Sequence, residues 1–141
     1  MAAIIRTKIS RNSASTDPNN NGSTAGGGIY SDGVSTISIV DSTIADNIAD
    51  YGGGIFCIGS TSITGCTISG NLANLDGDGI CSMGGTLSIK GATRITSNQA
   101  ITGYGGGIYS YPQITGNSTI TTTLDGTGIL IDSNKADKPT F

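Results

Sequence analysis

The stretch IADNIADYGGGIF, residues 44–56, decides the fold of this chain. It joins an I-x-x-N-x-A segment to a G-G-G-I segment through a short turn. Both segments recur with a period of about 25 residues, and an internal period of that length predicts a repeat architecture. The first segment recurs with Asn12, Asn47, Asn71, Asn98 and Asn134 and with Ile9, Ile44, Ile68, Ile95 and Ile131. The second recurs with Ile29, Ile55, Ile80 and Ile108.

Each period contains three short apolar segments and no helical pattern. In the cleanest repeat, residues 36–39 read TISI, which alternates apolar and polar side chains as a strand does. Gly and β-branched residues are also poor helix formers. The chain is therefore predicted to be all-β. It should form a single parallel β-helix domain over residues 1–141, with about five coils of roughly 25 residues and three short strands per coil.

Equivalent residues of successive coils should form ladders along the axis, because stacked strands lie about 4.8 Å apart. The isoleucines of both segments are predicted to point inward. The asparagines are expected to take left-handed backbone geometry at a corner and to hydrogen-bond to the asparagines above and below. Alternation places the residue after each second-segment isoleucine outward, which predicts a partly aromatic column of Tyr30, Phe56, Cys81 and Tyr109.

Composition narrows the classes of function. Only 12% of the residues are charged and 23 of 141 are Gly, but the periodic isoleucines distinguish the chain from a disordered one. The net charge is −3 and the 7 Lys and Arg residues do not cluster, which argues against nucleic-acid binding. Histidine, the commonest general base, is absent. No apolar stretch is long enough for a membrane span or a signal peptide.

Two polar stretches interrupt the repeat, and both ends of the chain fall at the same phase of the coil. Residues around 15–25 and 111–118 are predicted to be surface loop insertions. No capping element is evident at either end, and a solenoid without caps exposes apolar ladders and unpaired backbone. We expect another copy, or the rest of a longer protein, to cover the ends. The expected contacts are Ile4, Ile5, Ile9, Leu130 and Ile131.

The paired segments resemble the repeats of polymorphic outer-membrane proteins and related bacterial autotransporter passengers. Those repeats carry G-G-x-I and F-x-x-N tetrapeptides. Here residues 52–55 read GGGI and residues 44–47 read IADN, with Ile in place of Phe. The resemblance covers residues 8–136 and implies a right-handed parallel β-helix, displayed at the cell surface as a stalk, adhesin or structural fibre.

Several kinds of site compete with a purely structural role. Asp76 and Asp78 form the densest acidic pair and are weak calcium candidates, although they lack the repeating motif of calcium-binding solenoids. A polysaccharide lyase or glycosidase needs carboxylates that converge with a basic residue, whereas the acidic residues here are spread over turns. A threonine column for ice binding begins at Thr43 and Thr67 but is interrupted by Arg94. The aromatic column could stack on sugars.

The three cysteines have no spacing typical of a zinc site. Cys57 follows Ile55 by two residues and Cys81 follows Ile80 by one, so these two side chains should face opposite sides of their strands. Cys66 is the third. All three are interpreted as small residues that fill strand positions, because free cysteine packs like a small hydrophobic residue. The pattern does not decide whether any disulfide forms.

We therefore expect a non-catalytic extracellular or cell-surface structural protein without cofactor or metal. It should stack head to tail into a filament or form part of a longer stalk or adhesin. Its expected partners are other copies of itself or the remainder of a longer β-helix. The alternative is a carbohydrate-binding or carbohydrate-active module with surface glycans as partners, and an ice-binding protein ranks below both.

Overall fold

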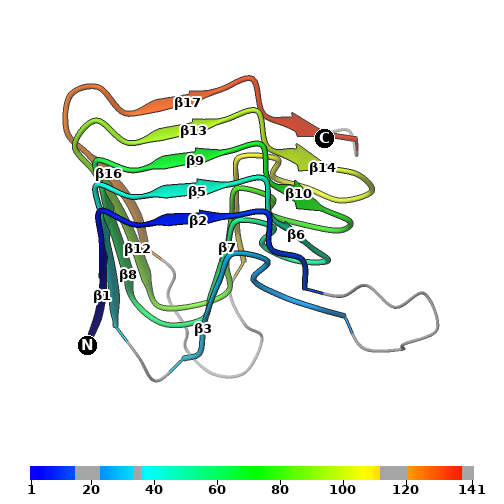
Figure 1. The fold of residues 1–141 in the computed structure, drawn as a ribbon, viewed down its shortest axis with the longest axis horizontal. Coiled ribbons are helices and arrows are strands. Elements are labelled where there is room, and N and C mark those ends of the chain that lie inside the picture. The colour runs from blue at the N-terminus through cyan, green and yellow to red at the C-terminus, as the bar shows by residue number, and fades with distance from the viewer. Residues whose placement is uncertain (15–22, 34–35, 112–120, 138–141) are drawn as a thin grey trace.

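Short parallel strands stacked in coils make up the fold (Figure 1). The computed structural model describes residues 1–14, 23–33, 36–111 and 121–137. Every pairing between the described strands is parallel. No helix in that part of the chain is long and apolar enough to cross a membrane. The prediction of an all-β, parallel β-helix arrangement is thus confirmed.

The strands form four sheets, which the chain meets in the same order in successive coils; the first two sheets have five strands and the other two have four. The first sheet contains β1 (Ala2–Ile5), β4 (Ile37–Val40), β8 (Thr61–Thr64), β12 (Thr86–Lys90) and β16 (Thr121–Asp125). The second contains β2 (Lys8–Ser10), β5 (Thr43–Ala45), β9 (Thr67–Ser69), β13 (Arg94–Thr96) and β17 (Leu130–Asp132). The third contains β6 (Ile48–Ala49), β10 (Leu72–Ala73), β14 (Gln99–Ala100) and β18 (Lys135–Ala136). The fourth contains β3 (Ile29–Ser31), β7 (Ile55–Cys57), β11 (Ile80–Ser82) and β15 (Ile108–Ser110).

The predicted number of three strands per coil is wrong by one. The additional strands are those of the third sheet, which have two residues each and directly follow the asparagines, as β6 follows Asn47. A strand of two residues is too short for the alternation of side chains to show in a sequence. The turn that the sequence places between the two segments therefore contains a sheet of its own.

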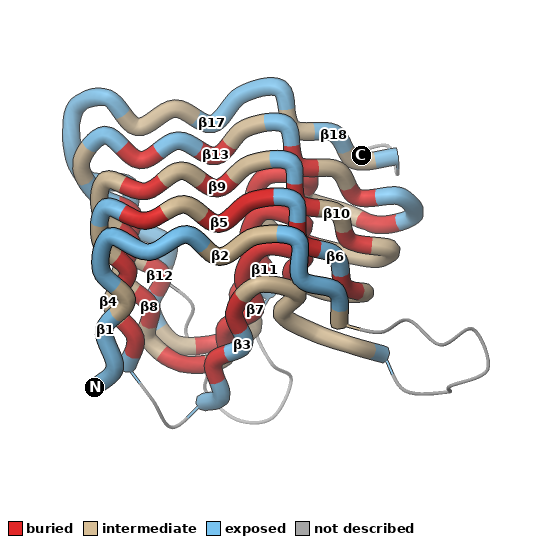
Figure 2. The backbone as a smooth tube through the Cα atoms, in the orientation of Figure 1, coloured by how far each residue is buried: buried red, intermediate tan, exposed pale blue. Residues whose placement is uncertain are grey.

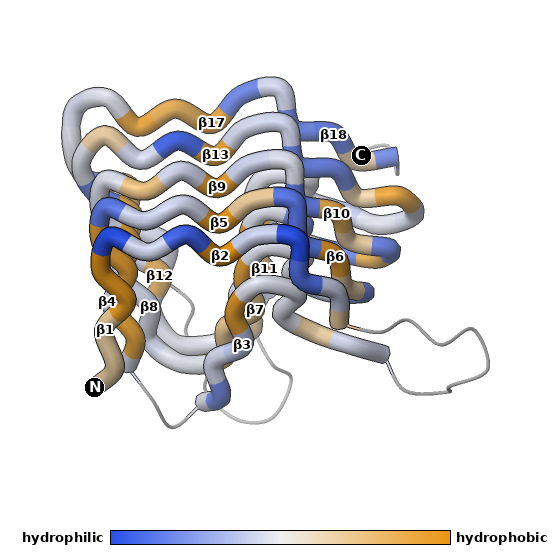
Figure 3. The backbone as a smooth tube through the Cα atoms, viewed as in Figure 1, coloured by the Kyte–Doolittle hydropathy of each residue, from blue (hydrophilic) through white to orange (hydrophobic). Residues whose placement is uncertain are grey.

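The isoleucine ladders fill the interior of the stack (Figures 2 and 3). Ile44, Ile68 and Ile95 pair in register across the second sheet and are fully buried. The ladder of the fourth sheet and a further ladder in the first sheet face the same interior, with the buried members Ile29, Ile55, Ile80, Ile39, Ile63 and Ile89. Burying one such side chain contributes about 1.5–3 kcal/mol.

The ladders become exposed where the described stack ends. Ile131 continues the ladder of the second sheet but is 42% exposed, because its strand β17 has a neighbour on one side only. At the other end Ile9 is half-buried. Ile108 of β15, the last strand of the fourth sheet, is also half-buried.

The asparagines form a continuous amide ladder along one corner. Asn47 Nδ2 donates to Asn71 Oδ1 at 3.0 Å, and the backbone N–H of Asn47 donates to the same oxygen at 3.1 Å. The second Nδ2 hydrogen of Asn47 goes to the carbonyl oxygen of Ile9 at 3.2 Å. Asn71 and Asn98 repeat all of these bonds, while Asn12 and Asn134 at the two ends form part of the set. Each buried amide therefore uses both donors and both lone pairs of its oxygen.

The third glycine of each G-G-G segment packs against this amide ladder. A Cβ on Gly28 would lie 3.0 Å from Asn47 Nδ2, and a Cβ on Gly54 would lie 3.0 Å from Asn71 Nδ2. The first glycine meets a different requirement, since Gly52 has a φ of 59°, which glycine adopts without strain. The two halves of the repeat are thus physically linked, because the asparagine corner of one repeat occupies the space that the glycine before it leaves open.

Left-handed backbone geometry falls on the residue before each asparagine and not on the asparagine itself. The φ angles are 59° at Arg11, 56° at Asp46, 63° at Gly70, 57° at Ser97 and 56° at Ser133. The expectation that the asparagines adopt this geometry is therefore wrong. The preceding residue turns the corner, and the asparagine directs its amide along the axis.

The first loop insertion is shorter than predicted. Thr24 and Ala25 already belong to the stack, since the Tyr51 N–H donates to the Thr24 carbonyl at 3.0 Å and Ala25 forms a parallel bridge with Tyr51. Tyr111 also belongs to it, because its N–H donates to the Ser82 carbonyl at 2.9 Å. The remaining parts of the predicted insertions, residues 15–22 and 112–118, lie outside the described residues.

Replacing Asn71 by Leu tests the amide ladder. The substitution removes the acceptor of Asn47 and the donor to Asn98 while nearly conserving side-chain volume. Because buried polar groups lose their partners, we expect the free energy of unfolding to fall by about 3 kcal/mol or more. Asn74→Leu is the control: the Asn74 side chain makes a single, partly buried bond to Asp50, and its loss should cost about 1 kcal/mol. Equal decreases in the free energy of unfolding of the two variants, measured by urea denaturation, would show that a bond of the amide ladder contributes no more than an ordinary side-chain hydrogen bond.

Replacing Ser97 by Gly tests the strained corner. Ser97 has a φ of 57°, so the substitution should relieve strain and stabilise the chain by about 1 kcal/mol. Ser69→Gly lies in β9, where glycine should destabilise by about 0.5–1 kcal/mol. The two variants should shift the urea midpoint in opposite directions. A Ser97→Gly variant less stable than the wild type would contradict the assignment of backbone strain to Ser97.

Candidate functional site

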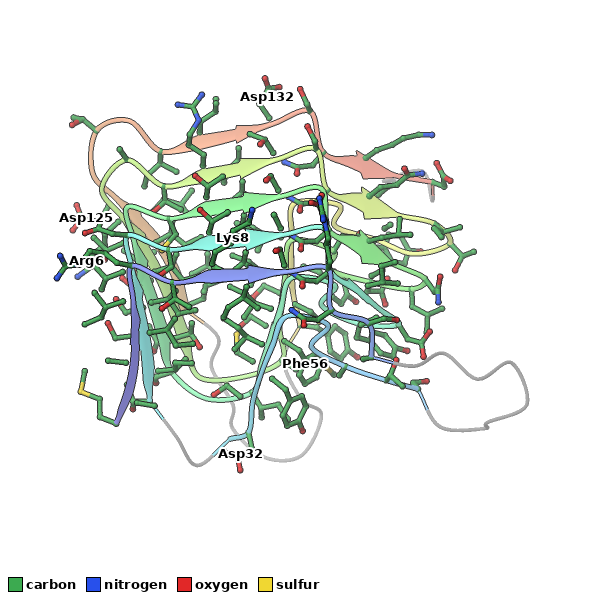
Figure 4. The ribbon with its side chains drawn as sticks, viewed as in Figure 1. Arg6, Lys8, Asp32, Phe56, Asp125 and Asp132 are labelled. Atoms are coloured by element: carbon green, nitrogen blue, oxygen red, sulfur yellow. The ribbon has the colours of Figure 1, made fainter. Side chains whose placement is uncertain are left out.

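A groove runs along the outer face of the fourth sheet, bordered by the turns that connect the third sheet to it. Phe56, which is labelled in Figure 4, lies on strand β7 of this sheet. The groove has a volume of about 480 Å³, which is within the usual range for small-molecule sites. We call it the aromatic groove. It is lined by Ser23, Ala25, Tyr51, Phe56, Asp76, Cys81, Met83, Tyr109 and Tyr111.

Three members of the predicted outward column, Phe56, Cys81 and Tyr109, line this groove. Tyr30, Phe56, Cys81 and Tyr109 are in register across the fourth sheet. The column is not uniformly exposed, as the word outward would suggest: Tyr30 is 57% exposed, but Phe56 is 6% exposed and Cys81 is fully buried. The turns are the reason, since they fold back onto the strand that follows. A Cβ on Gly77 would lie 2.6 Å from Cys81 Cβ, so this turn covers the outer side of β11.

Aromatic rings gather on both sides of Cys81. Tyr30 and Phe56 are stacked, with ring centroids 5.4 Å apart and an interplanar angle of 2°. Tyr109 is stacked with Tyr111 at 6.2 Å. Cys81 is the small member of the column, and it is fully buried because the turn at Gly77 packs onto it.

Among the described residues that line the groove, Asp76 is the only charged one. Its Oδ1 accepts the Tyr104 N–H at 2.6 Å, which fixes the carboxylate at the rim. Burial and then the negative charge of Asp76 raise the pKa of Tyr109.

The three cysteines are buried free thiols. Cys57 belongs to the interior cluster while Cys81 lies on the outer face of the same sheet, so they face opposite sides. Cys66 sits at a corner, where its Sγ donates to the Ile39 carbonyl at 3.4 Å. Burial raises the pKa of Cys57 and of Cys66, and it raises the pKa of Cys81 to about 12. Thiols in this state are poor nucleophiles and poor metal ligands.

Asp78 occupies the place of the second glycine of the repeat. At the matched position, a Cβ on Gly53 would overlap the carbonyl oxygen of Leu72. The carboxyl of Asp78 is fully buried, and its Oδ1 accepts the Ala73 N–H. Its Oδ2 has no hydrogen-bond partner among the described residues. Burial raises the pKa of Asp78 to about 8, so this carboxyl is mostly protonated at neutral pH.

The two calcium candidates therefore lie in different environments. Asp76 lies at the rim of the groove, whereas Asp78 is a buried, mostly neutral acid. Among the described residues, no three His, Cys, Asp or Glu side chains gather as a metal site requires. A buried neutral carboxyl is an unsuitable ligand for a hard cation that prefers charged oxygens.

The threonine column considered for ice binding lies on the second sheet. The register places Thr43, Thr67, Arg94 and Leu130 in one line after Lys8. The two threonines are thus preceded by Lys8 and followed by Arg94 and Leu130, so the column contains only two threonines in a row. This face has no flat array of hydroxyl groups.

Comparisons with protein-family models, with curated protein sequences and with solved structures found no match to this chain. The site therefore rests on its own geometry.

Sequence reasoning missed Tyr51, Met83 and Tyr111 as members of the groove. Alternation could have identified two of them, because Met83 and Tyr111 follow Cys81 and Tyr109 by two residues and so share their face.

Replacing Asp78 by Gly tests the buried carboxyl. Because the pKa of about 8 in the folded state exceeds the unfolded value of 3.8, the folded state holds a proton that the unfolded state has released. The free energy of unfolding of the wild type should therefore fall as pH rises from about 4 to about 8. Asp78→Gly also restores the repeat glycine. It should be more stable than the wild type, with a difference that grows toward pH 8.

The pH dependence of that difference is the informative measurement, since other groups titrate equally in both proteins. Asp78→Asn is the matched control. It keeps the side-chain size and removes the titration, so its stability relative to wild type should show the same pH trend with a smaller gain than Gly. Urea unfolding at pH 5 and pH 8 measures all three proteins. A constant difference between wild type and Asp78→Gly would contradict the buried neutral acid.

Proposed function

We propose that this chain is a non-catalytic structural subunit of an extracellular or cell-surface β-helix. Its coils would continue end to end, into further copies that build a filament or into the rest of a longer stalk or adhesin. The observation that carries the proposal is the polarity of the amide ladder at the two ends of the described stack. The resemblance to outer-membrane passenger repeats supports the surface location.

The two ends of the amide ladder offer opposite hydrogen-bonding groups. No described residue donates to Asn12 Oδ1, whereas the other amide oxygens of the ladder each accept two N–H groups. At the other end, the backbone N–H of Asn134 and one Nδ2 hydrogen have no acceptor among the described residues. A second copy placed about 4.8 Å beyond the last coil would join these donors to that oxygen.

The apolar ladders meet in the same arrangement. Continuing the strand register would place Ile9 of one copy beside Ile131 of the next. It would also place Ile4 beside Leu124, which is 53% exposed and was not among the predicted contacts. Each pair would extend an interior ladder by one step, as every coil already does for its neighbour.

Two of the predicted end contacts point sideways instead. Ile5 pairs with Val40, outside the interior ladder that Ile4 shares with Ile39. Leu130 pairs with Arg94, which is exposed. These side chains lie on the outer faces of their sheets, so they would flank the junction rather than fill it.

Charge has the same polarity as the ladder. Arg6, Lys8 and Arg11 lie in the first coil, while Asp125 and Asp132 lie in the last described one (Figure 4). In the continued register, Lys8 of one copy would be diagonal to Asp132 of the next on the same outer face. Long side chains reach each other at the roughly 7–8 Å of such a diagonal. Opposite charges at the two ends favour head-to-tail over head-to-head contact.

Sedimentation of the purified chain over a range of concentrations tests this function. A heterologous contact does not close on itself and propagates as a fibre, so we expect polymers that lengthen with concentration. Ile131→Lys should abolish them, because it places a charge in the junction, while Thr67→Lys on a central coil should leave them intact. A wild-type chain that stays monomeric at every concentration would defeat the filament version.

A charge exchange separates the junction from general loss of stability. Lys8→Asp alone and Asp132→Lys alone should each weaken polymerisation several-fold, since each leaves like charges opposed. The double exchange should restore it. If the double variant is as weak as the worse single variant, the two side chains do not face each other across the junction.

A further inference from the structure

The fourth sheet has an open edge at β15. This strand pairs with β11 on one side, and among the described residues no strand pairs with its other side. The other three sheets each continue by one strand into the next coil, with β16, β17 and β18. In the described part of the chain, that last coil therefore has a vacant position in the fourth sheet.

The backbone groups of β15 alternate between its paired side and its open side. The Tyr111 N–H donates to the Ser82 carbonyl at 2.9 Å, so Tyr111 and Tyr109 direct their backbone groups to β11. Ile108 and Ser110 direct theirs to the open side, where no described strand pairs with them. An edge with free N–H and C=O groups is a template for another strand.

The interior side chain at this edge is only partly covered. Ile80 is fully buried, because β11 has a strand on each side. Ile108 belongs to the same ladder but is half-buried. An isoleucine on one further strand would cover Ile108 as Ile108 covers Ile80. The three residues of β15 are uncharged, so the edge offers apolar contact and backbone pairing.

End-to-end stacking of two copies does not fill the vacant position. In the continued register, β1 of a second copy would lie beside β16 and its β2 beside β17. The strand that this first coil contributes to the fourth sheet is β3. It would lie two strand spacings beyond β15, or roughly 9.6 Å. A slot one strand wide would remain, with a free edge on each side.

The neighbours of the slot specify the sequence that fits it. The third glycine of each segment packs against the asparagine of the following coil, since a Cβ on Gly107 would lie 2.9 Å from Asn134 Nδ2. In the continued stack, the asparagine that follows the slot is Asn12 of the second copy. A segment in the slot therefore needs glycine there, then isoleucine for the interior ladder and an aromatic residue beside Tyr109 on the outer face.

We propose that the open edge of β15 binds an extended segment of a partner chain that carries the repeat's own G-G-G-I-aromatic pattern. The segment adds in parallel as the fifth strand of the fourth sheet, with main-chain bonds for affinity and the isoleucine for specificity. The second wall of the slot, β3, rests on the proposed end-to-end stacking. The edge of β15 itself is present in a single chain.

A labelled peptide with the sequence of residues 103–110, GYGGGIYS, tests the edge. Fluorescence anisotropy measures its binding to the wild type and to Ile131→Lys, which the proposed function expects to stay monomeric. We expect saturable binding to both, and binding to wild-type polymers at least about 10-fold tighter because two edges pair with the peptide. The Ile108→Asp version of the peptide should bind at least about 10-fold more weakly to either protein.

Amide hydrogen exchange locates the bound peptide. In monomeric Ile131→Lys, the peptide should slow exchange of the Ile108 and Ser110 amides by about 10-fold or more, because these two face the open side. The Tyr109 and Tyr111 amides already pair with β11, so their exchange should change little. A peptide bound to the outer face of the sheet would not produce this alternation.

A chain that fills its own edge is the matched control. Replacing residues 137–141 by a copy of residues 101–110 continues β18 along the path that leads from β14 to β15. This variant should no longer bind the peptide, because its own added strand occupies the edge. The same variant with Ile108→Asp in the copied segment should leave the edge open and bind the peptide as the wild type does.

The outcomes separate this proposal from the proposed function. A wild type that stays monomeric but binds the peptide would reject the filament and support the edge of β15. Polymers that form without binding the peptide would support the filament and overturn the strand-addition site. Equal affinity for the peptide and its Ile108→Asp version, or unchanged exchange at Ile108 and Ser110, would also overturn it.

Discussion

The amide ladder is the interaction on which the rest of the structure depends. A side-chain amide inside a protein must find partners for two donors and one acceptor, and here every partner comes from an adjacent coil. The ladder therefore forms only if the coils stack in register. It also requires a glycine beneath it, since a Cβ on Gly54 would crowd Asn71. The isoleucine ladders provide most of the burial, but they would tolerate small shifts that the amides would not.

The repeat is broken at two positions of one coil. Asp78 replaces a glycine and becomes a buried, mostly neutral acid, while Cys81 replaces an aromatic ring and is fully buried. The first substitution places a carboxyl where the other coils have no side chain, and the second interrupts the aromatic column. Departures from an otherwise consistent pattern are the expected position of functional or strained residues.

The stacking, the inward ladders and the register were predictable, because each depends only on a side-chain period and on a fixed distance between strands. The left-handed residue was misplaced by one position, since a serine such as Ser97 carries no sign of a strained φ and its asparagine neighbour does. The burial of Phe56 could not be foreseen either. It depends on turns that fold back onto the following strand, and alternation describes a strand without its cover.

The direction of each interaction separates assembly from recognition. Hydrogen bonds and apolar ladders run along the axis, so any continuation of the stack uses only its two ends. The aromatic groove faces sideways and would stay free in a filament. End-to-end association would then repeat the groove at regular intervals along a fibre, and linked sites can hold a partner that contacts several of them far more tightly than one site does. A weak single site is thus compatible with strong attachment, provided that the subunits remain in register.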